Sequence, residues 1–181
     1  MKHISSTSFQ AWRTPDALFQ GLNEELGPFD LDVAADAQNC KVYSFFDEDS
    51  NALSDGAKWH GTIVWCNPPY ADIRPWIDKA EVEVAAGHCE RVVMLVPASV
   101  GVAWFTYAAR KHAVDFFDER IRFALPPIHE VPEELRAKLF TKKGKPKTSP
   151  GGGNALIIVG TAPVEGARPV FRSARTGRLL L

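Results

Sequence analysis

The sequence has few cysteines and no arrangement of them that indicates a crosslink or a metal site. Its 181 residues include three cysteines, Cys40, Cys66 and Cys89, and no Cys-x-x-Cys pair. An odd and scattered set is not a disulfide framework, and the five histidines are scattered as well. We therefore expect no bound metal, and we interpret Cys66 as a small buried hydrophobic residue.

Long apolar runs are also lacking. No stretch approaches the ~18 consecutive apolar residues that a membrane-spanning helix needs. Residues 1–8 lack the apolar core of a signal peptide, which favours a cytoplasmic location. We expect residues 1–9 to be a disordered lead and residues 10–181 to form a single domain, since 45% hydrophobic content is enough for a full core.

The net charge of −1 conceals a strong asymmetry. Residues 1–134 hold 11 basic and 21 acidic residues, whereas residues 135–181 hold ten basic residues and one acid. Such a split indicates a polyanionic partner, and the alternative is a solvated charge run that balances the acidic part. Gly and Pro interrupt the densest stretch, so we expect a basic flexible loop over 136–153 rather than a helix. Its basic residues are Arg136, Lys138, Lys142, Lys143, Lys145 and Lys147.

Strand-like and helix-like segments alternate along the chain. Apolar spacing predicts helices over 15–26, 76–86 and 100–111, with Thr14 as the N-cap of the first. Strands are predicted over 29–35, 41–46, 62–66, 91–96, 113–117, 120–125 and 154–159. The order predicts an α/β fold with a doubly wound, mostly parallel sheet, in which the last two strands form an antiparallel edge hairpin.

The most informative motif is the tetrapeptide Asn67-Pro68-Pro69-Tyr70, which directly follows the predicted strand 62–66. In open α/β sheets, ligands bind at the carboxyl ends of the strands. The two prolines have a fixed φ and also restrict the residue before them, so the Asn67 amide is presented rather than folded away. This turn suits the binding of a planar exocyclic amine, with the Tyr70 ring stacked on the heterocycle that carries it.

Methyl transfer to such an amine would use this arrangement. The amine nitrogen is a poor nucleophile because its lone pair is delocalised into the ring. Two acceptors, the Asn67 side-chain oxygen and the Pro68 carbonyl, would favour a more tetrahedral and reactive nitrogen by positioning and electrostatics. A base inside a duplex is out of reach, so the target nucleotide would have to be flipped out of the stack.

A methyl donor needs a pocket of its own. A carboxylate is well suited to hold a ribose diol, and an acid among Asp47 and Asp49 follows the second predicted strand. Asp32, at the end of the first predicted strand, is a candidate for the amino-acid part of the donor. A plain solvated role remains the alternative for each of these acids.

Taken together, these stretches resemble the phage-type (Dam-like) DNA N6-adenine methyltransferase family over roughly residues 10–160. The matching segments include Trp12-x-Thr14-Pro15, the stretch 31–36, the tetrapeptide 67–70 and Arg120-x-Arg122-Phe123. The resemblance implies a Rossmann-like fold that uses S-adenosyl-L-methionine as donor and needs no metal. It also implies double-stranded DNA as partner, and a phage or prophage protein in the cytoplasm of a bacterial host, with a role in restriction-modification. We expect a monomer or a weak homodimer.

The resemblance also assigns roles to residues. It implies that Asn67, Pro68, Pro69 and Tyr70 are catalytic. It implies that the donor is bound by Trp12, Thr14, Pro15, Asp32, Ala34, Asp47 and Asp49. Arg120 and Arg122 would lie near the DNA, together with the lysines Lys142, Lys143, Lys145 and Lys147 of the basic loop.

The sequence departs from the wider methyltransferase pattern in one respect, because Ala34-Ala35-Asp36 stands where a glycine-rich loop is usual. It also has no room for a separate target-recognition domain, and phosphate contacts carry little sequence information, so we expect short or relaxed specificity. RNA adenine or protein glutamine as acceptor, and a decayed DNA-binding scaffold, are the alternatives. We interpret Gly151-Gly152-Gly153 as a hinge. Arg172, Arg175 and Arg178 would line DNA or solubilise a terminal strand.

Overall fold

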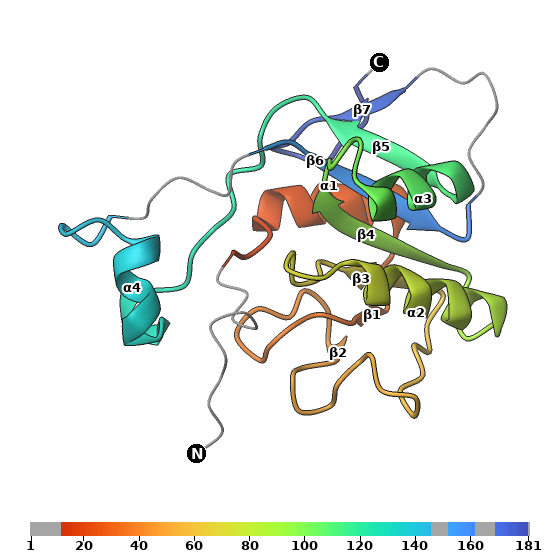
Figure 1. Cartoon of the computed structure of the whole chain (residues 1–181), viewed down its shortest axis with the longest axis horizontal. Helices are drawn as coiled ribbons and strands as arrows, with labels where there is room; N and C mark the ends of the chain where they lie inside the picture. The colour runs from red at the N-terminus through yellow and green to blue at the C-terminus, as the bar shows by residue number, and fades with distance from the viewer. Residues whose placement is uncertain (1–11, 146–151, 162–168, 181) are drawn as a thin grey trace.

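The structure, a computed structural model, describes residues 12–145, 152–161 and 169–180. These residues form a seven-stranded sheet in the order β2-β1-β3-β4-β6-β5-β7 (Figure 1). The strands are β1 (Leu31–Asp32), β2 (Ser44–Phe45), β3 (Ile63–Cys66), β4 (Arg91–Pro97), β5 (Ala113–Phe117), β6 (Asn154–Val159) and β7 (Val170–Arg172). The helices are α1 (Asp16–Leu26), α2 (Arg74–Ala85), α3 (Ala103–Lys111) and α4 (Glu133–Leu139), with a 3-10 turn η1 (Ile128–Glu130).

The strand directions confirm the expected doubly wound, mostly parallel sheet. Strands β2, β1, β3 and β4 are mutually parallel, and β5 is parallel to β7. The antiparallel strand is β6, which pairs with β4 on one side and β5 on the other. The antiparallel pairing therefore lies inside the sheet, whereas the sequence had predicted a hairpin at its edge.

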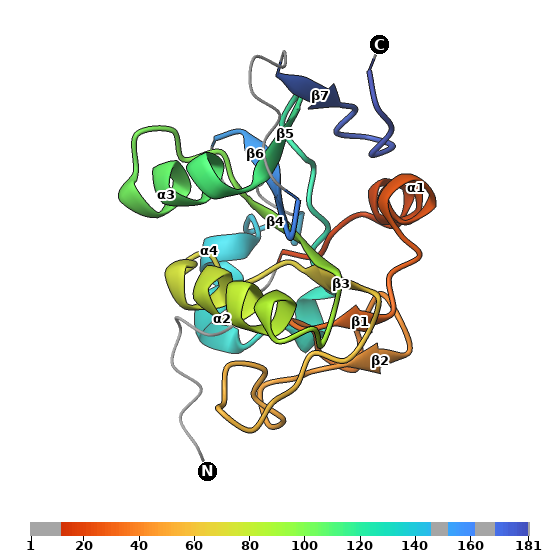
Figure 2. The same cartoon turned by 90° about the vertical axis from the view of Figure 1, so that its right-hand side faces the viewer.

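Helices cover both faces of this sheet, with α2 and α3 on one face and α1 on the other (Figure 2). Side chains that alternate along β4 divide between the two cores: Val92 and Met94 face α2 and α3, whereas Val93 and Leu95 face α1. Successive residues of a strand point to opposite faces, so a strand covered on both sides reads as one continuous apolar run. This explains why β4 and β6 were recognisable from the sequence.

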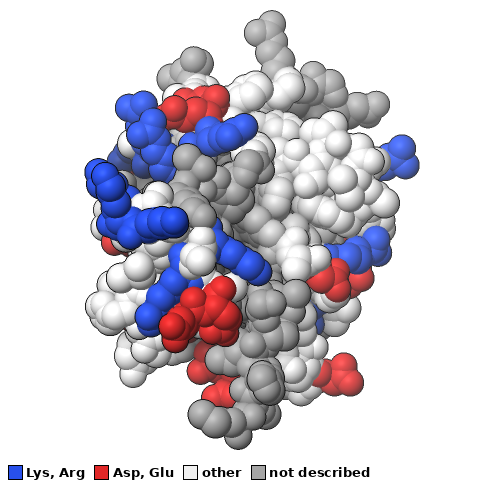
Figure 3. All heavy atoms as spheres, turned by 60° about the vertical axis from the view of Figure 1, so that its left-hand side comes forward, with Lys and Arg blue, Asp and Glu red and all other residues white. Residues whose placement is uncertain are grey.

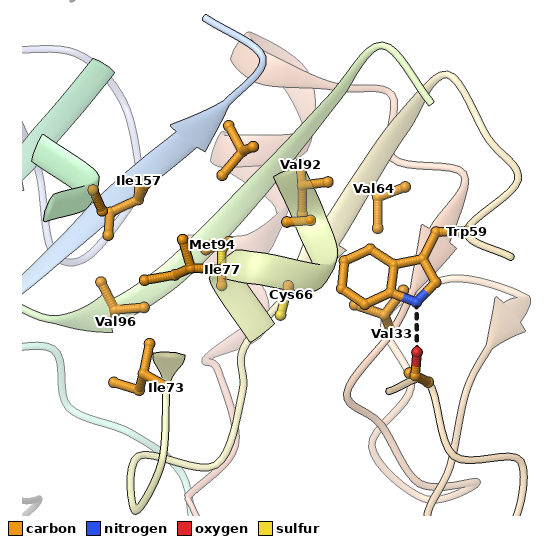
Figure 4. Packing of buried hydrophobic residues seen from close by; sticks show 14 of the residues in the cluster. Val33, Trp59, Val64, Cys66, Ile73, Ile77, Val92, Met94, Val96 and Ile157 are labelled. Carbon is orange, nitrogen blue, oxygen red and sulfur yellow. Dashed lines mark hydrogen bonds between the residues drawn. The ribbon is translucent and has the colours of Figure 1, made fainter. Parts of the chain in front are cut away.

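The loop between β2 and β3 is fixed by the core under α2. Trp59 is fully buried there, and its indole N–H donates a hydrogen bond to the Ala52 carbonyl at 3.0 Å (Figure 4). The loop is thus held in place although it contains no strand. It forms one side of the carboxyl edge of β1 and β3, where the candidate site lies.

The predicted strand over 120–125 was wrong. Ile121 and Phe123 are buried and Arg122 and Ala124 are exposed, so the period-two pattern is present. The segment pairs with the rest of the chain only through an isolated antiparallel bridge between Ala124 and Arg13, among the described residues. It is an extended segment laid over the α1 core, and side-chain alternation alone does not distinguish that from a sheet strand.

The expected loop over 136–153 was wrong at its beginning, because Arg136 and Lys138 lie on α4. Pro132 precedes this helix, acids occupy its first turn and bases its last turn, an arrangement that complements the helix dipole. The glycines and prolines that indicated a loop come after the helix. Figure 1 shows α4 set off to one side of the sheet, where Val131, Leu135 and Phe140 form a small core of their own.

The first helix was predicted correctly, but its cap was not. Pro15 is the N-cap residue of α1, and no side chain caps the helix. The Thr14 side chain is buried and bonded elsewhere, as described below. Residues 1–9, Lys147 and Gly151 lie outside the described residues.

Candidate active site

The tetrapeptide 67–70 leaves β3 at the carboxyl edge of the parallel strands, where the sequence had placed it. Asn67 and Pro68 are buried, and Pro69 and Tyr70 are partly exposed. The Asn67 side-chain amide donates a hydrogen bond from Nδ2 to Thr14 Oγ1 at 3.1 Å. Thr14 therefore holds the Asn67 amide, a contact between two predicted site residues that had been given different roles.

Thr14 is itself fixed by its neighbours. Arg13 exchanges two backbone hydrogen bonds with Ala124, of 2.8 and 2.9 Å. This bridge attaches the segment before α1 to the segment after β5. Trp12 is partly buried against the α1 core.

Tyr70 lies between aromatic and polar neighbours. Its ring meets Phe123 edge to face at 6.3 Å between centroids, and its hydroxyl oxygen accepts a hydrogen bond from Asn154 Nδ2 at 3.3 Å. Burial raises the pKa of the Tyr70 hydroxyl above its ordinary value, so the hydroxyl stays protonated at neutral pH. Asn154 was missed in the sequence, because one amide at the start of an apolar strand carries no signal.

A hollow of about 420 Å³ opens beside this turn, at the carboxyl ends of β1 and β2. We call it the first hollow. The residues that line it are Arg13, Val33, Ala34, Ala35, Asp36, Gln38, Asn39, Phe46, Asp47, Glu48, Asn51, Ala52, Pro69, Trp76, Pro126 and Glu130. One part of the first hollow is apolar, with Phe46 and Trp76, and its rim carries acids. Pro69 of the tetrapeptide also lines it.

The acids predicted for the donor are placed differently from one another. Asp47 lines the first hollow, and hydrogen bonds from the Ser50 side chain (2.6 Å) and backbone N–H (2.8 Å) lower the pKa of its carboxyl and orient it. Asp49 is exposed and is not among the lining residues of either described hollow. Of the two, the geometry favours Asp47, and it adds Glu48, which the sequence had not singled out.

Asp32 is a scaffold residue rather than a wall of either described hollow. Its side chain is 2% exposed and accepts hydrogen bonds from the backbone N–H groups of Ala34 at 3.3 Å and Lys41 at 3.1 Å. Burial raises the pKa of its carboxyl to about 6, although both hydrogen bonds act in the opposite direction. It therefore closes the loop that follows β1, and Ala34 of that loop lines the first hollow.

A second hollow of about 460 Å³ lies on the α1 side. Thr14 and Pro15 line it, as do Arg13, Gln38 and Asn39, which also line the first hollow. Arg13 and Asn39 were missed in the sequence.

The predicted DNA-binding residues lie on two segments. Arg120 and Arg122 are exposed on the stretch that places Phe123 against Tyr70. Residues 141–145 form a closed turn, here called the lysine turn, rather than a loose loop: Thr141 and Lys145 are linked by a backbone hydrogen bond of 2.8 Å, and Gly144 has the positive φ of +71° that the turn requires. The turn exposes Lys142, Lys143 and Lys145.

Figure 3 shows Lys and Arg side chains gathered on the side of the molecule where α4 lies. Arg136 of α4 has a structural task, since its guanidinium donates to the carbonyls of Val131 at 2.8 Å and His129 at 3.3 Å. Lys147 was predicted to join this surface and lies outside the described residues.

The three C-terminal arginines are paired with acids. Arg172 is buried and binds Asp115 and Glu25, both at 2.6 Å. Arg175 pairs with Glu119, and Arg178 pairs with Glu24. These contacts attach the C-terminal segment to α1, to the middle of β5 and to Glu119 after it. They favour a stabilising role over the DNA-lining role that the sequence had left open.

Comparison with known proteins agrees with this layout. A family model described as DNA N-6-adenine-methyltransferase (Dam) matches residues 2–150. The chain belongs to the Dam family. The DNA N-6-adenine-methyltransferase of Escherichia phage T1 is 34% identical over 104 residues, which are 56% of this chain and 42% of the phage protein. That of Haemophilus phage HP1 is 33% identical over 115 residues, 62% of this chain and 65% of the relative.

A third relative, the putative methyltransferase YfdM of Escherichia coli K12, is 39% identical over 70 residues, 36% of this chain and 71% of that protein. The chain thus spans less than two thirds of the length of the two phage relatives. No solved structure matches it.

The residues of the first hollow of this Dam-family protein fit a methyl donor of the S-adenosylmethionine type, which the family implies. A volume of about 420 Å³ is within the ordinary range for a small-molecule site. The wall of this hollow combines the Asp47 carboxylate, which suits a ribose diol, with the apolar surface of Phe46 and Trp76, which suits an adenine ring. In the same described part of the chain, no group of three or more His, Cys, Asp or Glu residues is arranged to hold a metal ion, and no helix is long and apolar enough to span a membrane.

Proposed function

We propose that this protein is a DNA adenine-N6 methyltransferase that transfers a methyl group from S-adenosylmethionine to an adenine flipped out of double-stranded DNA. One observation carries the proposal: the tetrapeptide 67–70 stands at the carboxyl edge of the sheet, and its Pro69 lines a hollow that suits the donor. Membership of the Dam family and the phage relatives support adenine as the acceptor.

The residues would divide the work as follows. The Asn67 side-chain oxygen and the Pro68 carbonyl accept hydrogen bonds from the exocyclic amine and direct its lone pair toward the methyl group. Tyr70 stacks on the flipped adenine. Because its hydroxyl stays protonated, Tyr70 serves in binding and not as a base. The proton lost from the amine leaves to water.

The first hollow would hold the donor. Asp47 is ionised and oriented by Ser50, and it suits the ribose hydroxyls, while Phe46 and Trp76 offer apolar surface to the donor's adenine. When bound, S-adenosylmethionine supplies an electrophilic methyl group on a sulfonium. Binding on a rigid sheet edge places the two reactants next to each other, which is the main contribution that positioning makes to catalysis.

DNA would be bound through phosphates by the lysine turn and by Arg120 and Arg122. Such contacts fix position on the duplex but carry little sequence information, so we propose short or relaxed specificity. Mapping of methylated sites in treated DNA tests this, and a strict preference for a site of about six or more base pairs would refute it.

The decisive experiment incubates the protein with S-adenosylmethionine and unmethylated genomic DNA, then measures N6-methyladenine by mass spectrometry of the nucleosides. An increase that Asn67→Ala abolishes supports the reaction, the acceptor and the site together. Donor binding without DNA methylation shifts support to an RNA or protein acceptor, and the same assay is then run on those substrates. Absence of donor binding supports a decayed scaffold.

A further inference from the structure

The segment that connects β4 to α3, residues 98–102, carries two exposed valines (Figure 1). We call it the β4–α3 turn. Val100 is 77% exposed and Val102 is 46% exposed. Single exposed apolar residues are ordinary on protein surfaces, so their exposure does not by itself indicate a site. The position and the rigidity of this turn distinguish it from such residues.

The β4–α3 turn lies at the same edge of the sheet as the tetrapeptide. Strands β3 and β4 are parallel neighbours, so the chain leaves both of them at the carboxyl edge. Asn154 links the two segments: it stands opposite Pro97, the last residue of β4, and its side chain donates to the Tyr70 hydroxyl at 3.3 Å. The turn begins at the residue after Pro97. It is therefore a neighbour of the place where a flipped adenine would stack on Tyr70.

Tyr70 lies between this turn and a basic segment. Its side chain packs against both cores of the protein. On the α1 face it meets Phe123, which is preceded by the exposed Arg122. On the opposite face Ala98, the first residue of the turn, packs against the core under α2 and α3. A duplex that brings a base to Tyr70 would thus place a phosphate near Arg122 on one side and its base stack near the β4–α3 turn on the other.

Backbone hydrogen bonds fix the shape of the turn. The Val100 N–H donates to the Ala98 carbonyl at 2.9 Å. The Val102 N–H donates to the Ser99 carbonyl at 3.0 Å. Between the two valines, Gly101 has a positive φ of +89°, a conformation that glycine adopts without strain. The Val100 side chain is thus exposed on a turn that is already ordered, and its burial in a partner would cost little further conformational entropy.

A flipped adenine leaves an empty place in the duplex stack. Proteins that distort DNA frequently insert an apolar side chain between base steps, which stabilises the distorted form. We propose that Val100 enters the base stack of the bound duplex beside the flipped adenine, with Val102 covering the bases next to it. This inference rests on the proposed function, since it names how the same site holds the duplex open.

Tyr43 is the rival exposed side chain. It is 99% exposed, but it stands at the amino end of β2, the outermost strand of the sheet. Strand β1 separates β2 from β3, so Tyr43 is neither at the carboxyl edge nor on a strand next to the tetrapeptide. Val82 is 59% exposed in the last turn of α2, at the end of that helix away from the tetrapeptide. It provides a matched control for Val100.

The test compares two duplexes that differ only opposite the target adenine, at a site identified by methylation mapping. In one the adenine is paired with thymine, and in the other it faces an abasic position, so no base pair has to be broken. Val100→Ser should lower the single-turnover methylation rate of the paired duplex about 5–10-fold, an effect of the order expected when a valine is no longer buried. The rate on the abasic duplex should change less than about 2-fold, because flipping is already easy there.

Three further variants serve as controls. Val100→Leu keeps an apolar side chain and should retain most of the rate on both duplexes. Val82→Ser and Tyr43→Ser remove exposed apolar surface elsewhere and should leave both rates unchanged.

The outcomes separate the possible failures. If Val100→Ser leaves both rates unchanged, or lowers both equally, the insertion of Val100 is overturned while the proposed function stands. The same holds if the unchanged protein methylates the abasic duplex alone, because it then does not open a paired one. If the unchanged protein methylates neither duplex, the proposed function fails together with the insertion.

Discussion

Thr14 and Asn67 lie 53 residues apart in the sequence and are joined by a buried hydrogen bond of 3.1 Å. Because Asn67 donates from Nδ2, its side-chain oxygen is directed away from Thr14. The amide group is thereby held in one of its two flip orientations. A target amine would require this orientation, because the amine donates hydrogen bonds and the side-chain oxygen is the atom that accepts them. Thr14, which the family resemblance assigns to the donor, thus also orients the Asn67 amide.

Replacement of the Thr14 hydroxyl tests this role. Thr14→Val keeps the shape but removes the acceptor, so the Asn67 amide loses its fixed orientation, and we expect turnover to fall about 10-fold. Thr14→Ser keeps the hydroxyl and should retain most of the activity. Single-turnover methylation at saturating donor measures the effect. A rise in the dissociation constant of S-adenosylhomocysteine with unchanged turnover would show that Thr14 serves the donor instead.

The sequence alone was sufficient to predict the local structure of those parts of the site that depend on residues adjacent in the chain. The apolar run of β3 followed by Asn67 and two prolines specifies a strand and a rigid turn, and the structure has both. The sequence named Asp47 and Asp49 as candidates after β2, and the structure places Asp47 and Glu48 on the wall of the first hollow.

Contacts between distant segments were not predictable from one sequence. The pairing of Thr14 with Asn67, and of Asn154 with Tyr70, depends on how the chain returns across the sheet. The C-terminal arginines show the same limit, because their regular spacing did not reveal that Glu24, Glu25 and Asp115 would neutralise them. The segment 120–125 was misassigned because alternation reports which side chains are covered, not whether the backbone has a partner.

The aromatic ring of Tyr70 should matter more to the reaction than its hydroxyl, which contacts Asn154. Asn154 Nδ2 bonds the Tyr70 hydroxyl at 3.3 Å and the Val96 carbonyl at 3.4 Å, so Tyr70→Phe removes one weak contact while keeping the stacking ring. We expect Tyr70→Phe to lower turnover by no more than about 3-fold, and Tyr70→Ala by about 10-fold or more, since base–aromatic stacking is worth ~1–3 kcal/mol. Fluorescence of DNA with 2-aminopurine at the target position would report whether flipping is lost. Equal activity of the Phe and Ala variants would remove Tyr70 from base binding.

The lysine turn is expected to dominate DNA affinity. Lys142, Lys143 and Lys145 are exposed on a closed turn, so their simultaneous change to Ala should weaken DNA binding and reduce the slope of log affinity against log salt by about 2–3. The matched control changes Arg175 and Arg178, which are equally basic but paired with Glu119 and Glu24, and should leave the slope nearly unchanged. Titrations at several salt concentrations measure both. An unchanged slope in the lysine variant would exclude the turn from the DNA interface.

The buried carboxyl of Asp32 should make folding stability depend on pH. Burial raises its pKa from 3.8 in the unfolded chain to about 6, so between these values the folded state holds a proton that the unfolded state has released. Stability from this group therefore falls as pH rises from about 4 to about 6, by roughly 2–3 kcal/mol. Asp32→Asn removes the titration, and urea unfolding of both proteins from pH 4 to pH 7 gives the difference.

Glu83 does not disturb the comparison. Burial would raise the pKa of its carboxyl, but hydrogen bonds from Lys79, the Trp59 backbone and His88 lower it to about 2, and this titration is common to both proteins. If wild type instead gained stability over the variant as pH rose, the two N–H donors of Ala34 and Lys41 would outweigh the cost of burying the charge.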